Sequence, residues 1–138
     1  MKKILLITLA AIILLSFSVQ TLATTETSSR DITPMWTYIM NISAYLKISS
    51  TGNATCSSDM LQRSSDNSSE LVMKLQKLNS DKWTTVATWT KKGSMESSNL
   101  AYKDVTKGTY RLSVTGNVYN DSGTLAETTT IYSTIETH

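Results

Sequence analysis

Cys56 and His138 are the residue types that most often carry covalent or metal chemistry, and the chain has one of each. A cysteine nucleophile needs a neighbouring base, and His138 is the last residue, which we expect to fray. One cysteine and one histidine do not supply the ligands of a zinc site. We therefore predict that Cys56 has a structural role, as a small buried residue on the inner face of a strand.

The eleven acidic residues do not form a recognisable catalytic pair, because they stand singly, mostly beside Ser, Thr or Lys. Glycoside hydrolysis would require two carboxylates across a cleft. The segment 120–123 faintly resembles a calcium loop, but it lacks the alternating acids and the terminal Glu, so we predict a hairpin turn. The sequence has no Gly-rich phosphate loop. These observations predict a protein that is not an enzyme and holds no cofactor or metal.

Aromatic side chains are the feature with binding potential. Exposed Trp and Tyr rings on a flat sheet can stack on sugar rings or anchor a protein partner. The alternative is ordinary packing in the core with a few scattered surface rings. The candidate binding residues are Trp36, Tyr45, Trp83, Trp89 and Tyr132.

The segment 107–114 indicates which elements would position these side chains. Tyr110, Leu112 and Val114 alternate with polar residues, which is the period of a strand with one buried face. Gly108 sits in the turn just before Tyr110. A Tyr at this place is typical of the tyrosine corner of immunoglobulin-type sandwiches, where its hydroxyl bonds back to the main chain. We assign Gly108 and Tyr110 structural roles.

Similar alternation recurs along the chain. Segments 42–48 and 54–60 predict two strands of a hairpin joined by a turn at 50–53. Segment 71–75 also alternates, although a helix over 69–78 is the competing interpretation. In segment 83–90 the large apolar residues fall at every third position, so we expect a bulge, or one Trp inside and the other outside.

Together these segments predict an all-β fold, an antiparallel immunoglobulin-like or fibronectin-III-like β-sandwich of about seven strands. Turn signals separate the strands at intervals of roughly ten residues, which favours a sandwich or barrel over an α/β fold. We expect one such domain over residues 35–138.

The N-terminal segment predicts the localisation of the protein. Lys2 and Lys3 precede an apolar run, and Ala23 ends a small-residue triplet, so residues 1–23 are typical of a secretory signal peptide. A membrane-spanning anchor is the alternative, but the run is shorter than the roughly 18–20 apolar residues that it needs. Residues 24–34 are rich in Ser and Thr and predict a flexible leader. We expect a secreted product with no membrane anchor after cleavage.

The charge balance excludes one class of partner. Without Lys2 and Lys3 the 13 basic residues become 11, equal to the 11 acidic ones. A formally neutral chain lacks the excess of Lys and Arg that is typical of nucleic-acid-binding proteins, so we expect no nucleic-acid partner.

Several of these segments also carry a resemblance. They are 48–57, 75–77, 83–86, Trp89 and 107–111. In these segments the chain resembles small secreted proteins of Gram-positive bacteria, a family without an assigned function. The resemblance covers about residues 36–135 and implies a secreted immunoglobulin-like sandwich. It implies nothing about a ligand.

Two functions remain open from the sequence. The first is a recognition module for a glycan or an extracellular protein surface, which would use the exposed aromatic residues. The second is a structural or envelope-associated protein that acts by self-association or by pairing an edge strand with another chain. The aromatic residues favour the first function, and the Ser/Thr-rich strands favour the second.

Overall fold

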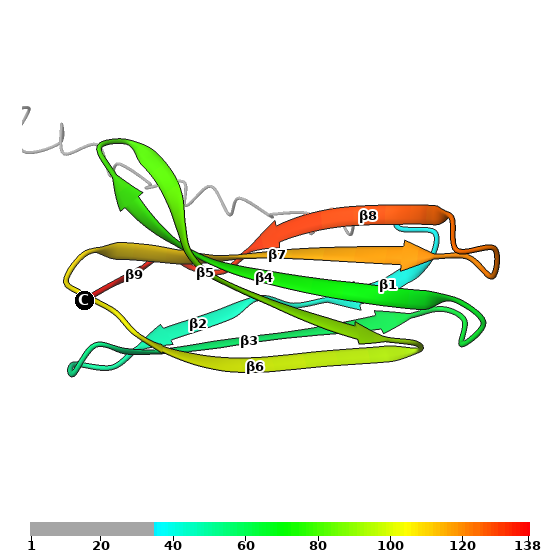
Figure 1. Cartoon of the computed structure of the whole chain (residues 1–138), viewed down its shortest axis with the longest axis horizontal. Helices are drawn as coiled ribbons and strands as arrows, with labels where there is room; N and C mark the ends of the chain where they lie inside the picture. Colours follow the sequence, from blue (N-terminus) through cyan, green and yellow to red (C-terminus); the bar gives the residue numbers. More distant parts are fainter. Residues whose placement is uncertain (1–34) are drawn as a thin grey trace, which may run out of the picture. The chain divides into compact units, whose positions relative to one another are not determined.

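A computed structural model describes residues 35–138, and their regular structure is entirely β (Figure 1). The signal peptide predicted for residues 1–23 and the leader predicted for 24–34 lie outside the described residues. Two antiparallel sheets make up the domain. The predicted all-β sandwich is confirmed.

The first sheet has four strands, β1 (Ile39–Ile42), β2 (Tyr45–Ile48), β3 (Asn53–Gln62) and β6 (Glu96–Asp104). Both β1 and β2 pair with β3, β1 near its end and β2 near its start, while β6 pairs with β3 along nearly its whole length. The strand expected over 42–48 is therefore interrupted at residues 43–44.

The second sheet has five strands, β4 (Ser68–Asn79), β5 (Lys82–Gly93), β7 (Thr109–Tyr119), β8 (Leu125–Tyr132) and β9 (Glu136–Thr137), with the order β5-β4-β7-β8. The short β9 continues β8 along β7 after an interruption at residues 133–135. Nine strands thus replace the expected seven because two sheet edges, β1 with β2 and β8 with β9, are each broken in two.

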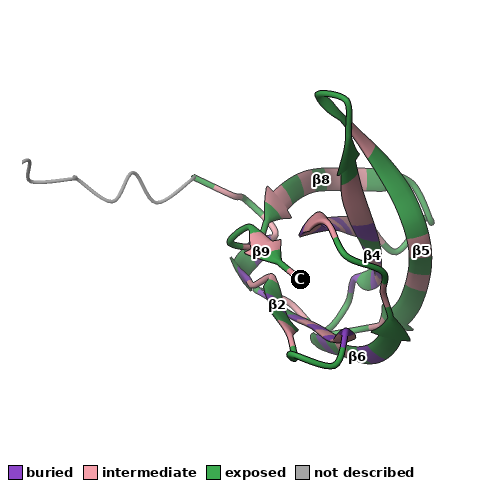
Figure 2. Cartoon of the chain, turned by 90° about the vertical axis from the view of Figure 1, so that its left-hand side faces the viewer, coloured by how far each residue is buried: buried purple, intermediate pink, exposed green. Residues whose placement is uncertain are grey.

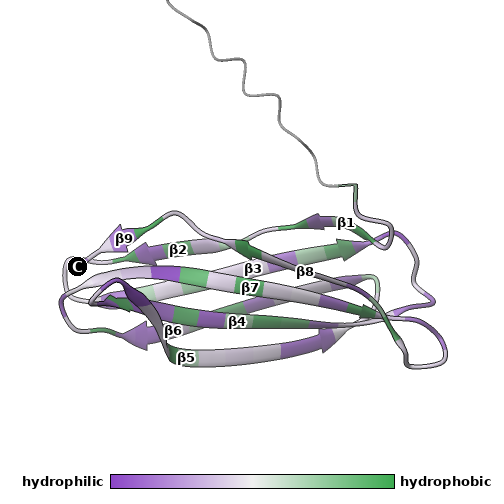
Figure 3. Cartoon of the chain, turned by 90° about the horizontal axis from the view of Figure 1, so that it is seen from above, coloured by the Kyte–Doolittle hydropathy of each residue, from purple (hydrophilic) through white to green (hydrophobic). Residues whose placement is uncertain are grey.

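The core lies between the inner faces of the two sheets. Alternate residues of β3, β4 and β7 are buried, and hydrophilic and hydrophobic colours accordingly mix along these strands in Figure 3. Segment 69–78 is part of strand β4, so the helical alternative is wrong. The buried apolar residues are Ile39, Ile42, Leu46, Ala54, Cys56, Met60, Leu71, Met73, Leu75, Ala101, Tyr110, Leu112, Val114 and Val118.

The pairing of β4 with β5 contains the expected irregularity. The register shifts between Leu75 and Gln76, which pair with Ala87 and Thr85. Because of this bulge Trp89 pairs with the buried Met73 and packs against the core, whereas Trp83 lies on the outer face. Both parts of that prediction are confirmed. The far end of the β4–β5 hairpin protrudes from the sandwich and is exposed (Figure 2).

Tyr110 forms the expected corner. Its hydroxyl donates a hydrogen bond of 2.7 Å to the carbonyl oxygen of Thr106, and its ring is buried. Gly108, just before it, exchanges two backbone hydrogen bonds with His138, of 3.1 and 3.0 Å. The expected fraying of His138 is therefore wrong, because this backbone pairing extends the β7–β9 ladder.

Gly116, on the inner face of β7, leaves room for side chains of the opposite sheet. A Cβ atom at this position would lie 2.5 Å from Sδ of Met60 and 2.9 Å from Cδ1 of Ile42. Those two side chains belong to β3 and β1, so the sheets approach each other closely here because residue 116 has no side chain.

Candidate functional site

The five candidate binding residues do not share one surface. Trp36 and Trp89 are half-buried and pack against the core. Trp83 and Tyr132 both contact Arg111 on the outer face of the five-stranded sheet, and Tyr45 lies on the four-stranded sheet. The aromatic residues therefore divide into core packing and two separate outer faces.

On the five-stranded sheet, the guanidinium of Arg111 lies between the rings of Trp83 and Tyr132, 4.3 and 4.1 Å from their centroids. Arg111 Nε also donates a 2.8 Å hydrogen bond to Oε1 of Gln76. Cation–π contacts of this kind hold a side chain in place. Since one face of each ring is occupied by Arg111, we interpret this arrangement as structural. It links side chains of β5, β4, β7 and β8.

The four-stranded sheet presents a different arrangement, which we call the tyrosine face. Its large residues are Tyr45 on β2 with Leu100 and Tyr102 on β6, exposed by 52, 57 and 62 %. Ser57 and Thr55 of β3 lie between them, because Tyr45 and Leu100 both pair with Ser57 and Tyr102 pairs with Thr55. Residues paired in this way project from the same side of the sheet.

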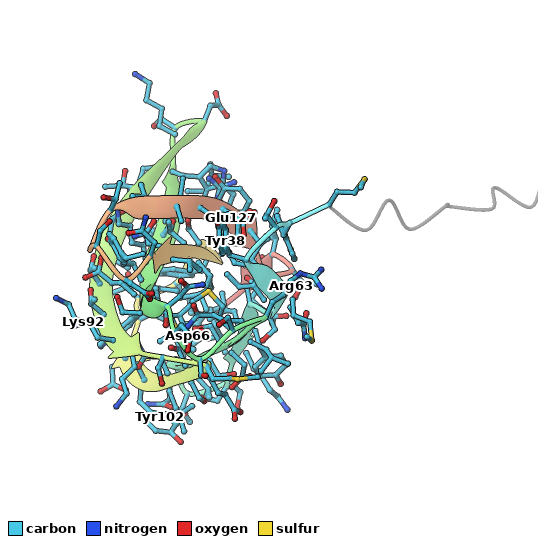
Figure 4. All side chains as sticks on the ribbon, turned by 90° about the vertical axis from the view of Figure 1, so that its right-hand side faces the viewer. Tyr38, Arg63, Asp66, Lys92, Tyr102 and Glu127 are labelled. Carbon is cyan, nitrogen blue, oxygen red and sulfur yellow. The ribbon has the colours of Figure 1, made fainter. Side chains whose placement is uncertain are left out.

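The spacing on the tyrosine face follows from this register. Tyr45 and Leu100 stand two strands apart, so their backbones are roughly 10 Å apart. Between β2 and β6, strand β3 contributes only Ser57 and Thr55 to this face. These small side chains leave the inward-facing sides of Tyr45 and Tyr102 uncovered. Figure 4 shows Tyr102 directed away from the body of the sandwich. The result is two neighbouring rows across β2, β3 and β6, Tyr45–Ser57–Leu100 and Lys47–Thr55–Tyr102. Each row has one tyrosine at an outer position and a hydroxyl group in the middle.

Tyr45 was a candidate from sequence, whereas Leu100 and Tyr102 were not. The alternation of β6 is inverted, because the small or polar Ser97, Asn99 and Ala101 face inward while the large residues face outward. A pattern that assigns large apolar residues to the core cannot find them. The register between β6 and β3 is the signal that identifies the face, and it depends on tertiary structure.

Cys56 is fully buried on the inner face of β3, as the alternation predicted. Burial raises the pKa of its thiol to about 11. A cysteine with such a pKa is protonated at neutral pH and is a poor nucleophile and a poor ligand.

Glu127, on β8, connects the two sheets. Its carboxylate accepts hydrogen bonds from three successive backbone N–H groups, those of Thr37 (2.9 Å), Tyr38 (2.8 Å) and Ile39 (2.8 Å). Burial alone would raise the pKa of Glu127, but these three donors, together with the charge of Arg63, oppose that effect and hold the pKa below its ordinary value. The ionised carboxylate therefore fixes the start of β1.

Residues 35–138 also contain neither a metal-binding cluster nor a membrane-spanning helix. Within that range there is no group of three or more His, Cys, Asp or Glu side chains arranged to hold a metal ion. Over the same residues, no helix has the length and apolarity that crossing a membrane requires.

Comparison with known proteins adds no family assignment. No model of a known protein family matches the chain, and no curated protein matches it. The resemblance to small secreted proteins of Gram-positive bacteria thus stays a prediction, and function must be argued from the surfaces described above.

Proposed function

We propose that this chain is a secreted, non-catalytic recognition module that binds a glycan through the tyrosine face. The observation that carries the proposal is the group of large, half-exposed side chains, Tyr45, Leu100 and Tyr102, on one outer face. Exposed aromatic residues grouped on one surface are typical of a binding site rather than of packing.

The chemistry between the large residues favours a glycan over a protein ligand. A sugar has an apolar ring face that stacks on a phenol ring and hydroxyl groups that bond to Ser57 and Thr55. A stable protein partner would need roughly 800 Å² on each side with a continuous apolar centre. The tyrosine face has three large apolar or aromatic side chains and the charged Lys47, and Ser57 and Thr55 separate the residues of β2 from those of β6.

The sheet edges support recognition over strand pairing as the function. Two edges are interrupted, at residues 43–44 and 133–135, so neither offers a long row of unpaired backbone groups. Of the other two, β5 carries lysines at positions 82, 91 and 92, and β6 carries Glu96, Lys103 and Asp104. Interruptions and edge charges are features that natural sheets use against pairing with other chains.

The proposal is tested by retention of the secreted chain on insoluble polysaccharides. Cellulose, chitin and xylan are suitable probes, with the bound fraction measured by sedimentation. We expect retention on at least one of them, and we expect Tyr102→Ala and Tyr45→Ala each to weaken it by about tenfold, since losing one anchor residue at a binding surface costs more than 1 kcal/mol.

The matched control is Tyr132→Ala. Tyr132 is exposed by 53 %, nearly the same fraction as Tyr45, but it lies on the other sheet. This variant should keep full retention. Retention that depends on Tyr132 and not on Tyr102 would contradict the proposal, and so would an absence of retention on every glycan tested.

A further inference from the structure

A pocket of about 630 Å³ opens at the end of the sandwich, apart from the tyrosine face. Three connections line it: residues 37–38 before β1, residues 63–67 between β3 and β4, and residues 120–122 between β7 and β8. Figure 4 looks at this end, with Tyr38, Arg63 and Asp66 around the opening and Tyr102 well away from them. We call it the end pocket.

The lining of the end pocket combines one aromatic ring with many planar polar groups. Tyr38 supplies the ring, and Arg63, Asp66, Asn67 and Asp121 supply a guanidinium, two carboxylates and an amide. Asn120 and three hydroxyl side chains complete the lining. Ordinary ligand pockets are mostly apolar with a few polar groups, so a lining of eight polar residues and one aromatic residue favours a ligand rich in hydrogen-bonding groups.

Several of these polar groups have hydrogen-bonding capacity to offer a ligand. Among the described residues, no hydrogen bond or ion pair engages the carboxylate of Asp121, and Asp66 accepts one bond, of 3.2 Å from Ser64, through a single oxygen. Asn120 uses its carbonyl oxygen within the turn, where Ser122 and Thr124 donate to it at 2.7 and 2.9 Å. Its amide nitrogen makes no hydrogen bond to any of residues 35–138.

The walls of the end pocket are held in place before any ligand binds. Glu127 fixes the backbone of Thr37 and Tyr38 by the hydrogen bonds described above, and the backbone N–H of Arg63 donates to the carbonyl oxygen of Tyr38 at 2.9 Å. Gly123, with a φ of +76°, closes the turn that carries Asp121. A preformed pocket loses little conformational entropy on binding.

The charges of the lining restrict the class of ligand. Arg63 contributes one positive charge, and Asp66 and Asp121 contribute two negative charges, so a phosphate or an acidic sugar would be repelled overall. A calcium ion takes six to eight oxygen ligands, usually with several carboxylates, and two are present here. A neutral polyhydroxylated ligand fits best, because carboxylate, amide and guanidinium groups bond to pairs of hydroxyls. Tyr38 packs against the core but is only half-buried, and its uncovered part can contact the apolar face of a sugar.

We propose that the end pocket binds the terminal sugar of a neutral saccharide, as a second site that is independent of the tyrosine face. The volume suits one or two sugar rings, which is the scale of an ordinary ligand pocket. Binding of a chain end at this pocket would differ from contact along a chain at the tyrosine face, so each site can be present without the other.

The test is a titration of the ¹⁵N-labelled secreted chain, followed by amide chemical shifts. The probes are D-mannose, D-galactose, D-glucose and N-acetyl-D-glucosamine, with inorganic phosphate and calcium chloride as separate controls. We expect at least one sugar to give saturable shifts at Tyr38, Asn67 and Asn120. Phosphate and calcium should leave these signals unchanged.

Matched variants locate the binding. Asp121→Asn should weaken sugar affinity by about tenfold, because a charged acceptor is replaced by a neutral group. Asp81→Asn makes the same change in an exposed turn at the far end of the β4–β5 hairpin and should have no effect. Tyr102→Ala should leave the end-pocket shifts intact even if it abolishes retention on polysaccharides, so the two proposals succeed or fail separately.

Three results would overturn the inference. These are no saturable shift with any of the four sugars, shifts confined to Tyr45 and Tyr102, and equal weakening by Asp121→Asn and Asp81→Asn. The spectrum of each variant without ligand reports its folding, so a loss of binding can be separated from a loss of structure.

Discussion

The carboxylate of Glu127 accepts the backbone N–H of Tyr38 at 2.8 Å, although 89 residues separate them in the chain. The bond joins β8 of one sheet to the segment that leads into β1 of the other. One ionised side chain therefore determines where the first strand begins.

Glu127→Gln should lower the free energy of unfolding by about 1–3 kcal/mol, because hydrogen bonds to a charged acceptor are worth more than those to a neutral one. The amide keeps one acceptor oxygen for three N–H donors. Urea unfolding at neutral pH measures the change. Glu136→Gln, in the same part of the chain, is the control and should be nearly neutral; equal effects of the two variants would count against the special role of Glu127.

The same contact predicts a dependence on pH. The pKa of Glu127 is lower in the folded chain than in the unfolded chain, where an ordinary glutamate titrates at roughly 4.3. The stabilisation is therefore fully present above that value and is lost as the pH falls through the lower folded pKa. Unfolding measured from pH 7 to pH 3 should show this loss, and Glu127→Gln should reduce its size. An identical pH profile in the variant would contradict the assignment.

Tyr110→Phe should lower the free energy of unfolding by about 0.5–1.5 kcal/mol, and by more if the carbonyl oxygen of Thr106 finds no water. The phenol hydroxyl donates to that oxygen at 2.7 Å, and the ring is buried. Denaturant midpoints compared with those of Tyr102→Phe, where the hydroxyl is exposed, provide the measurement. A midpoint equal to that of the wild-type chain would mean that the corner bond adds no stability.

Cys56→Ser should destabilise the fold more than Cys56→Ala. A hydroxyl at this buried position must be desolvated, at a cost of roughly 1–3 kcal/mol, and the neighbouring inner-face hydroxyl of Ser58 already has no partner among the described residues. Alanine leaves only a small void. A thiol reagent applied to the native chain should label Cys56 slowly, and labelling should become fast in urea. Fast labelling of the native chain would refute the burial.

Much of the core could be predicted from the sequence, because alternate side chains of a strand point to the same face, and apolar residues at alternate positions mark the buried face. Cys56, Leu112 and Val114 lie on inner faces for that reason, and the irregular spacing of Trp83 and Trp89 correctly indicated a bulge. The tyrosine corner was predicted from a single residue, Tyr110, because of its position after a turn.

The surfaces could not be predicted in the same way. The tyrosine face depends on which residues of β6 pair with β3, and the end pocket depends on three connections that meet only after folding. Segment 120–122 was predicted only as part of a hairpin turn, and segment 63–67 is a polar stretch without a motif. Their proximity is set by long-range strand order, and no local pattern encodes it.

The absence of a side chain at Gly116 has a consequence for related sequences. Residue 116, Met60 and Ile42 occupy one shared volume, although they come from strands that are far apart in the chain. Selection should therefore act on the sum of the three side chains and not on each alone. In a library randomised at these positions, functional variants with Ala or Ser at 116 should carry a shorter residue at 60 or 42. The three positions would covary as one unit, and that covariation would bring β1 next to β7 in a reconstruction of the fold from sequences alone.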